Sequence, residues 1–186
     1  MVNGGIVRMQ GTVKGQFTVS TKSEYQPALW EEQNVWSYKC WCYKKKLVKI
    51  QDEGYKGGSV FLDNDITYNT NPLTNPNSTD LLGIVSEGDV MITDNAANNS
   101  DIKIHASIFS QNGGFGAENY DTRPIAGKIE LLGGIIQDTR RAVGTFSGST
   151  TNHGFDKRYR YDERFLLVSP PHFPGTGSYE IISWFE

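Results

Sequence analysis

The feature that most constrains this sequence is a recurrence of short apolar runs separated by glycine or by polar corners. Residues 127–146 show it most clearly, because no run within them is long enough for a helix. Short apolar runs between turn residues are typical of short, largely buried parallel strands. We therefore expect a chain built from such strands. The runs in this stretch are Ile129–Leu132, Ile135–Ile136 and Ala142–Phe146.

The same rhythm occurs earlier in the chain, around polar corners at residues 63–65 and 87–89. From Val60 onward the runs recur at roughly 19 to 25 residues, a spacing that indicates a solenoid. The sequence thus predicts an all-β fold, a right-handed parallel β-helix of about five coils that stack to form one core. A β-sandwich is the alternative, since it also has short strands and glycine-rich turns. The residues expected in the shared core are Val60, Ile66, Val85, Val90, Ile92, Ile104, Ile108, Ile129, Leu131, Ile135 and Val143.

Length and charge limit the classes of protein to consider. With 186 residues, the chain is expected to form a single domain, residues 1–186. A net charge of -3 does not indicate a nucleic-acid surface. No apolar run approaches the length of a membrane span. The chain begins in turn residues without a signal peptide, and we expect it to be an excised part of an exported protein rather than a cytoplasmic one.

Residues 24–57 interrupt the pattern with a different composition, which predicts an irregular Trp/Cys/Lys-rich insertion. We expect this lobe to cover one end or flank of the coil, because an open end invites pairing with another chain. One interpretation makes Trp30, Trp36 and Trp41 an aromatic platform with a basic rim, for sugar or nucleic acid. The favoured interpretation packs these aromatics onto the coil and leaves the lysines in solvent.

The two cysteines, Cys40 and Cys42, lie in the same insertion. A Cys-x-Cys pair does not fill a structural zinc site, which takes four ligands. Residues one apart are also poorly placed to bridge each other. We interpret them as free thiols or as an incidental pair, and we expect neither a metal nor a cofactor.

Four carboxylates, Asp63, Asp65, Glu87 and Asp89, fall at corners that a coil would stack on one another. Such a cluster could hold calcium, or act as the acid and base of a glycosidase. The favoured explanation is turn chemistry, since Asp beside Asn or Gly suits tight corners. We expect these groups to be largely exposed, with no shared metal and no cleft.

Two further motifs are weak. The segment Gly113–Glu118 echoes a calcium-binding nonapeptide, but it occurs once and ends in Glu instead of Asp. The three histidines share no ligand spacing. His105 sits inside an apolar run and is expected to be a hydrogen-bonded core or coil-face residue.

Residues 154–186 are expected to form a C-terminal capping tail over the last coil. The first part is dense in Tyr, Arg and Asp, and predicts ion pairs of Arg158, Arg160 or Arg164 with Asp156 or Asp162. The prolines at 170–174 require an extended chain. Phe165, Phe173 and Trp184 are expected to be mostly buried.

Several of these stretches together resemble an uncharacterised bacterial family, the domain of unknown function numbered four thousand nine hundred. The similarity covers roughly residues 58–186, and more weakly 4–20, and it leaves out residues 28–57. It implies an exported, pilus- or surface-associated protein, and hence an extracellular or cell-surface location. The family has no established active site to carry over. The matching stretches are Asp65–Tyr68, Ile104–Phe109, Leu131–Phe146, Lys157–Arg164, Pro170–Pro174 and Ser183-Trp184.

The function expected from these observations is a non-enzymatic structural or adhesive domain of an exported bacterial surface or pilus-associated protein. Its partners would be another protein of the assembly or a polysaccharide. The alternative is a polysaccharide-active enzyme or a carbohydrate-binding module on a β-helix scaffold. A groove that gathers carboxylates beside aromatics would favour that alternative.

Overall fold

A computed structural model describes residues 2–3, 6–39, 41–51 and 54–174. These residues form strands connected by loops, with a short 3-10 helix, η1 (Glu163–Leu166), after the last strand. No helix in these ranges is long and apolar enough to cross a membrane. The strands are β1 (Val2–Asn3), β2 (Val7–Val13), β3 (Gln16–Gln26), β4 (Leu29–Ser37), β5 (Cys42–Gln51), β6 (Gly54–Gly57), β7 (Val60–Tyr68), β8 (Leu81–Ser86), β9 (Val90–Ile92), β10 (Ile102–Ser110), β11 (Phe115–Ala117), β12 (Ile125–Gln137), β13 (Gly144–Ser147) and β14 (Thr150–Tyr161).

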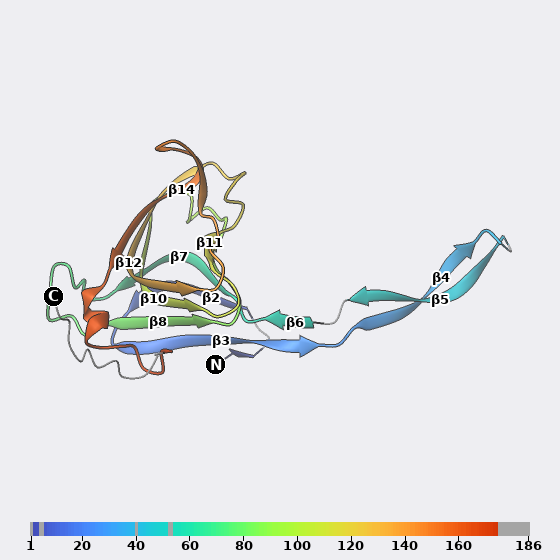
Figure 1. Ribbon diagram of the computed structural model, residues 1–186, viewed down its shortest axis with the longest axis horizontal. Coiled ribbons are helices and arrows are strands. Elements are labelled where there is room, and N and C mark those ends of the chain that lie inside the picture. Colours follow the sequence, from blue (N-terminus) through green and yellow to red (C-terminus); the bar gives the residue numbers. More distant parts are fainter. Residues whose placement is uncertain (1, 4–5, 40, 52–53, 175–186) are drawn as a thin grey trace, which may run out of the picture.

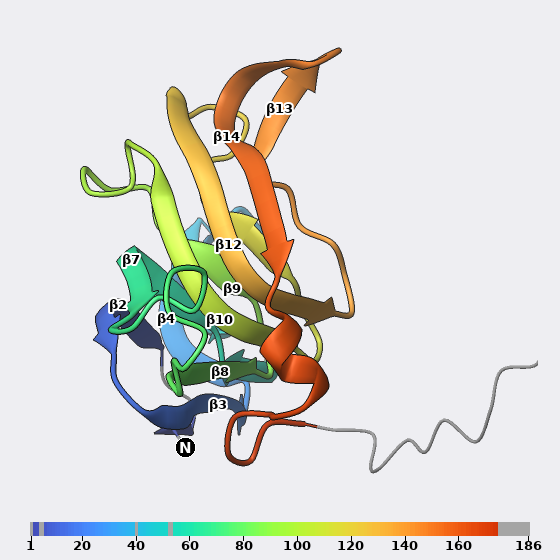
Figure 2. The same ribbon diagram turned by 90° about the vertical axis from the view of Figure 1, so that its left-hand side faces the viewer.

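The main sheet is a mixed, nearly closed barrel of seven strands in the order β1-β3-β8-β10-β12-β14-β13. Its neighbours pair in parallel up to β14, and the last pair, β13 with β14, is antiparallel. The strands β2, β7, β9 and β11 join the same sheet through β7, which pairs with β10. Figure 2 shows the sheet curving from β3 through β10 and β12 to β14.

The predicted right-handed parallel β-helix is therefore wrong, because the main sheet of the described residues is a nearly closed barrel and not a solenoid. In a solenoid, each repeat contacts only the repeats beside it along one axis. Here one continuous sheet curls until it is nearly closed. The twist between neighbouring strands provides the curvature, and β3, β12 and β14, with 11, 13 and 12 residues, are long enough to follow it.

Glycines and polar residues that resemble corners in the sequence lie inside strands in the structure. The runs on either side of Gly133 and Gly134 belong to one strand, β12. Gly133 is needed there because a Cβ would overlap the carbonyl oxygen of Ala106 on β10. The supposed corner at Asp63–Asp65 likewise lies inside β7. The corner at Glu87–Asp89 is a real turn, between β8 and β9.

The prediction of one shared core is confirmed for most of the residues named. Ile135 packs against the core while only partly buried, and Val85 lies outside it. Ile104 and Ile129 are fully buried. The core cluster to which they belong takes residues from the barrel strands β8, β10, β12 and β14 and from β2, β7, β9 and β11. The predicted residues in the core cluster are Val60, Ile66, Val90, Ile92, Ile104, Ile108, Ile129, Leu131 and Val143.

The interrupting segment forms a regular hairpin that projects away from the barrel (Figure 1). β3 extends outward and pairs antiparallel with β6. Beyond this pair, β4 and β5 form a separate two-stranded antiparallel sheet. We call residues 29–51 the hairpin arm. It is neither irregular nor a cover for the barrel, and its tryptophans do not pack onto the core.

The C-terminal part of the described chain first forms a strand of the barrel and only then packs against β8. Residues 154–161, expected in the cap, belong to β14. After η1 the chain crosses β8, where a Cβ at Gly83 would collide with Phe173 and approach Pro170. Phe165 and Phe173 are partly buried. Trp184 lies outside the described residues.

Candidate functional site

The hairpin arm carries an exposed aromatic face. Alternate residues of a strand share a face, so the cross-strand pairs Trp30–Lys49, Glu32–Leu47, Asn34–Lys45 and Trp36–Tyr43 all lie on one side. We call these eight residues the aromatic face. The exposed fractions are 54% for Trp30, 38% for Trp36, 69% for Tyr43 and 63% for Leu47.

Side-chain contacts across the two strands hold this face in shape. The Lys45 ammonium lies 2.8 Å from the Glu32 carboxylate. Trp36 and Tyr43 meet edge to face, with their ring centroids 5.0 Å apart. The Lys49 ammonium lies 5.5 Å from the centre of the Trp30 ring. Each contact stabilises the pair of strands modestly and leaves the rings open to solvent.

The third predicted platform residue, Trp41, lies at the tip of the arm. Its exposed fraction is 76%. Its φ of 50° is in the left-handed region, which bulky residues rarely adopt and which costs of order 1–3 kcal/mol. The three tryptophans are therefore spread along the arm and its tip rather than gathered into one pocket. Cys42, beside Trp41, is disulfide-bonded rather than a free thiol, and Cys40 lies outside the described residues.

The predicted corner carboxylates are partly buried, and each is used as a hydrogen-bond acceptor. Asp63 accepts from the Arg8 guanidinium at 2.7 Å, and Asp65 accepts from the backbone N–H of Lys103 at 2.8 Å. Glu87 accepts from the backbone N–H of Ser23 at 2.6 Å. These partners lie on three different strands, β2, β10 and β3, so each carboxylate connects a different pair of segments.

Asp89 has the most partners of the four carboxylates. Its Oδ1 accepts from the backbone N–H of Gly114 at 2.8 Å, and both its oxygens bind the Arg141 guanidinium, at 2.9 and 3.1 Å. A glycosidase needs two carboxyl groups across a sugar-sized cleft. The four carboxylates do not meet in this way, and the described residues contain no group of three acidic, histidine or cysteine side chains placed to hold a metal.

The glycines that resemble a calcium-binding repeat have a packing role. A Cβ at Gly114 would overlap the carbonyl oxygen of Thr139. At Gly113 it would collide with Asp89, and at Gly116 with Arg141. The backbone of this segment thus passes so close to its neighbours that side chains do not fit, which explains the glycines without an ion.

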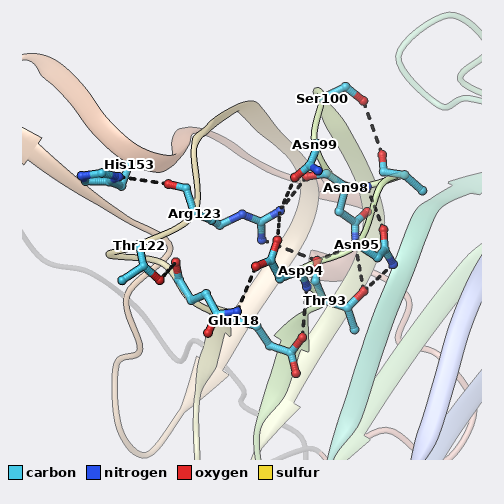
Figure 3. Close-up of polar contacts among 12 residues, drawn as sticks. Thr93, Asp94, Asn95, Asn98, Asn99, Ser100, Glu118, Thr122, Arg123 and His153 are labelled. Atoms are coloured by element: carbon cyan, nitrogen blue, oxygen red, sulfur yellow. Dashed lines mark hydrogen bonds and ion pairs between the residues drawn. The ribbon is translucent and has the colours of Figure 1, made fainter.

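A buried guanidinium that the sequence did not reveal belongs to Arg123. Figure 3 shows its polar contacts with the segment of residues 94–99. The Arg123 side chain is fully buried, with its Nη2 2.8 Å from the Asn98 carbonyl oxygen and 3.6 Å from the Asp94 carboxylate. It also lies 4.7 Å from the centre of the Phe155 ring. Burial lowers the pKa of Arg123, and Asp94 opposes that shift. These contacts anchor the excursion of residues 94–101 to the barrel, which is a structural role.

His105 occupies the buried position that the sequence indicated. Its Nδ1 accepts a hydrogen bond from the backbone N–H of Tyr68 at 3.0 Å. In the neutral imidazole the proton is therefore on Nε2. Burial is the main cause that lowers the pKa of His105, and the Lys103 and Arg164 charges act in the same direction.

The sequence also did not reveal a set of basic residues on the outer side of the barrel. Lys103, Lys128, Arg158 and Arg160 line one groove together with His105. The sequence indicated only that two of these arginines could form ion pairs. One such pair, Arg158 with Asp156 at 2.7 Å, is confirmed, as is Arg164 with Asp162. The grouping depends on strand register, which no local pattern shows.

Comparison of the chain with protein-family models, with curated proteins and with solved structures finds no match in any of the three.

Proposed function

We propose that the protein is a non-enzymatic structural or adhesive domain of an exported bacterial surface or pilus-associated protein. The observation that carries this proposal is the hairpin arm, which extends from the barrel (Figure 1). The arm exposes the aromatic face to solvent. The carboxylates considered for catalysis act as acceptors within the sheet instead.

The arm is poorly suited to remain alone in water. An isolated two-stranded hairpin is marginally stable, and a third strand or a packing partner is usually needed. The sheet of the arm contains only β4 and β5, and the residues of β4 from Leu29 to Trp36 are all exposed. A partner strand that extends the sheet would stabilise the arm.

The distribution of charge favours a second copy of this chain as that partner. β4 carries Glu31 and Glu32, whereas β5 carries three consecutive lysines, Lys44–Lys46. Like charges disfavour pairing of β5 with another β5, but β4 of one copy and β5 of the next are complementary. Such a contact is head-to-tail and leaves a free edge at each end, so it generates an open chain of subunits.

The location of this assembly is the cell surface in our proposal. The disulfide of Cys42 supports export, because disulfides persist in oxidising compartments and are rare in the cytosol. Antibody labelling of intact cells of the source bacterium tests this point, and a signal found only after lysis would contradict it.

Charge exchange tests the head-to-tail contact. The variant E31K/E32K makes both strands of the arm basic, and the variant K44E/K45E/K46E makes both acidic. We expect the wild-type protein to associate with increasing concentration in sedimentation velocity, and each variant alone to remain monomeric. An equimolar mixture of the two variants should associate again, because each arm then meets its complement.

The mixture makes this experiment decisive. A folding defect in either variant would not be rescued by mixing, whereas lost complementarity would be. As a matched control, K14Q/K22Q changes two exposed lysines outside the arm and should leave association unchanged. Wild-type protein that stays monomeric at millimolar concentration would contradict self-association, as would variants that associate separately as well as the wild type.

A further inference from the structure

A groove on the barrel surface has the size of a small-molecule site. Its volume is about 540 Å³, within the usual range for ligand pockets. Residues of β7, β10, β12 and β14 line it, and Asn71 and Leu73 of the excursion between β7 and β8 complete the lining. The groove is separate from the hairpin arm.

Strand register concentrates basic side chains in this groove. Lys103, Glu130 and Arg158 are neighbours across β10, β12 and β14. Two residues further along the same strands, His105, Leu132 and Arg160 form the next row. Because alternate residues share a face, both rows lie on the same side of the sheet, and Lys128 extends that side along β12.

The charge of the groove is opposite to that of the whole protein. Its lining contains four cationic side chains and one carboxylate, on a chain with net charge -3. Arg158 is paired with Asp156. Lys103, Lys128 and Arg160 form no ion pair among the residues that the structure describes. A concave surface lined by one sign of charge focuses its field and attracts ligands of the opposite sign.

The neutral groups of the groove suit a ligand rich in hydroxyl groups. Thr67 and Asn71 offer a hydroxyl and an amide. His105 contributes an imidazole whose Nδ1 is already occupied by the Tyr68 N–H, so Nε2 remains as a donor. Leu73 and Leu132 provide apolar surface for the C–H groups of a sugar ring.

Two other classes of anionic ligand fit less well. Single-stranded nucleic acid binds by stacking its bases on aromatic rings. The one aromatic lining residue apart from His105, Tyr68, is buried, and the Arg164 guanidinium lies 5.1 Å from its ring centre. An extended peptide often binds by adding a strand to an open sheet edge. β10 and β12 are paired on both sides, so the floor of the groove offers no such edge.

We propose that this groove binds an anionic saccharide, with Lys103, Lys128 and Arg160 contacting its carboxylate or phosphate groups. The guanidinium of Arg160 can hold such a group through two parallel hydrogen bonds, and the lysines act as point charges. The site does not depend on the arm or on self-association, so the two proposals stand or fall separately.

Isothermal titration calorimetry at low salt tests the proposal with three probes: digalacturonate, glucose 1,6-bisphosphate and neutral maltose. We expect at least one anionic sugar to bind with a Kd of about 1 mM or lower, and maltose to show no heat of binding. Raising the salt concentration should weaken the anionic ligand. A preference between the two anionic probes identifies carboxylate or phosphate as the group recognised.

Two variants with the same change in net charge distinguish binding in the groove from a general electrostatic attraction to the protein. K103Q/R160Q removes two cations from the groove, and K14Q/R140Q removes two exposed cations outside the groove lining. We expect the first variant to weaken binding at least tenfold and the second less than twofold. Equal losses in the two variants would overturn the site, as would the absence of binding by both anionic sugars at 10 mM. Tighter binding of an oligothymidylate, lost in K103Q/R160Q, would overturn the saccharide assignment.

Discussion

Individual buried polar side chains attach loops of this protein to the barrel. Arg123 connects the segment around Asn98 to the barrel through a charged hydrogen bond of 2.8 Å and a ring contact with Phe155. Asn98, itself fully buried, donates from its side-chain amide to the carbonyl oxygens of Leu62 and Thr93. Because these groups are out of water, each loses much if its partner is removed.

Replacing Arg123 with Met should therefore be costly. We expect the free energy of unfolding to fall by about 2–4 kcal/mol, since the substitution removes the donor to the buried carbonyl oxygen of Asn98 and leaves Asp94 without its cation. Chemical denaturation followed by circular dichroism measures the loss. Arg141→Met is the matched control, because Arg141 pairs with Asp89 at the surface and exposed ion pairs contribute only about 0–1 kcal/mol. Equal losses in the two variants would contradict the anchoring role.

Strands of this protein differ in how much they depend on the rest of the fold. β12 pairs with β10 along one edge and with β14 along the other. Position 133 of this strand requires glycine, because a Cβ there would overlap the Ala106 carbonyl oxygen of β10. β4 and β5, by contrast, pair only with each other. The arm is joined to the barrel through β3 and β6, whose residues Gln26 and Gly54 pair directly.

The arm should therefore be removable without loss of the barrel. Replacing residues 27–53 with an Asn-Gly turn connects β3 to β6 at a pair that a two-residue hairpin loop can close. In differential scanning calorimetry we expect the melting temperature to stay within about 3 °C of that of the monomeric wild type, because few barrel contacts are lost. Self-association should disappear. A barrel that unfolds after this replacement would show that the arm is part of the folding unit.

At the scale of the whole molecule, two buried titratable groups connect segments that are distant in the sequence. Asp80 accepts backbone N–H bonds from Gly15 at 2.7 Å and from Thr70 at 2.8 Å, so it joins three stretches of chain. The bond from Gly15 is the main cause that lowers the pKa of Asp80. His105 joins β10 to β7 through the Tyr68 N–H.

These groups predict how stability depends on pH. The pKa of His105 is lower in the folded state, so its contribution is complete above the unfolded value of about 6.5 and is lost as pH falls through the folded value. The lowered pKa of Asp80 adds a second loss below its usual value of 3.8. Urea denaturation from pH 8 to pH 5 should show a decline that His105→Gln flattens, since the Gln side-chain oxygen can accept the Tyr68 N–H. The exposed His172→Gln should keep the decline, and an identical slope in both variants would contradict this assignment.

The sequence alone determined the all-β class, most of the core and the turn at 87–89, because those features depend on local hydrophobic patterns and turn chemistry. The Arg–Asp pairs at 156–164 were also predictable from local spacing. Whether Gly133 marks a corner or lies within a strand depends on how closely β10 approaches it, which is a non-local fact. The same holds for the groove, where Lys103 and Arg160 lie 57 positions apart in the chain and meet only through the register of three strands. The barrel, the projecting arm and the basic groove were therefore decided by tertiary structure, since sheet closure and strand register depend on contacts between residues far apart in the chain.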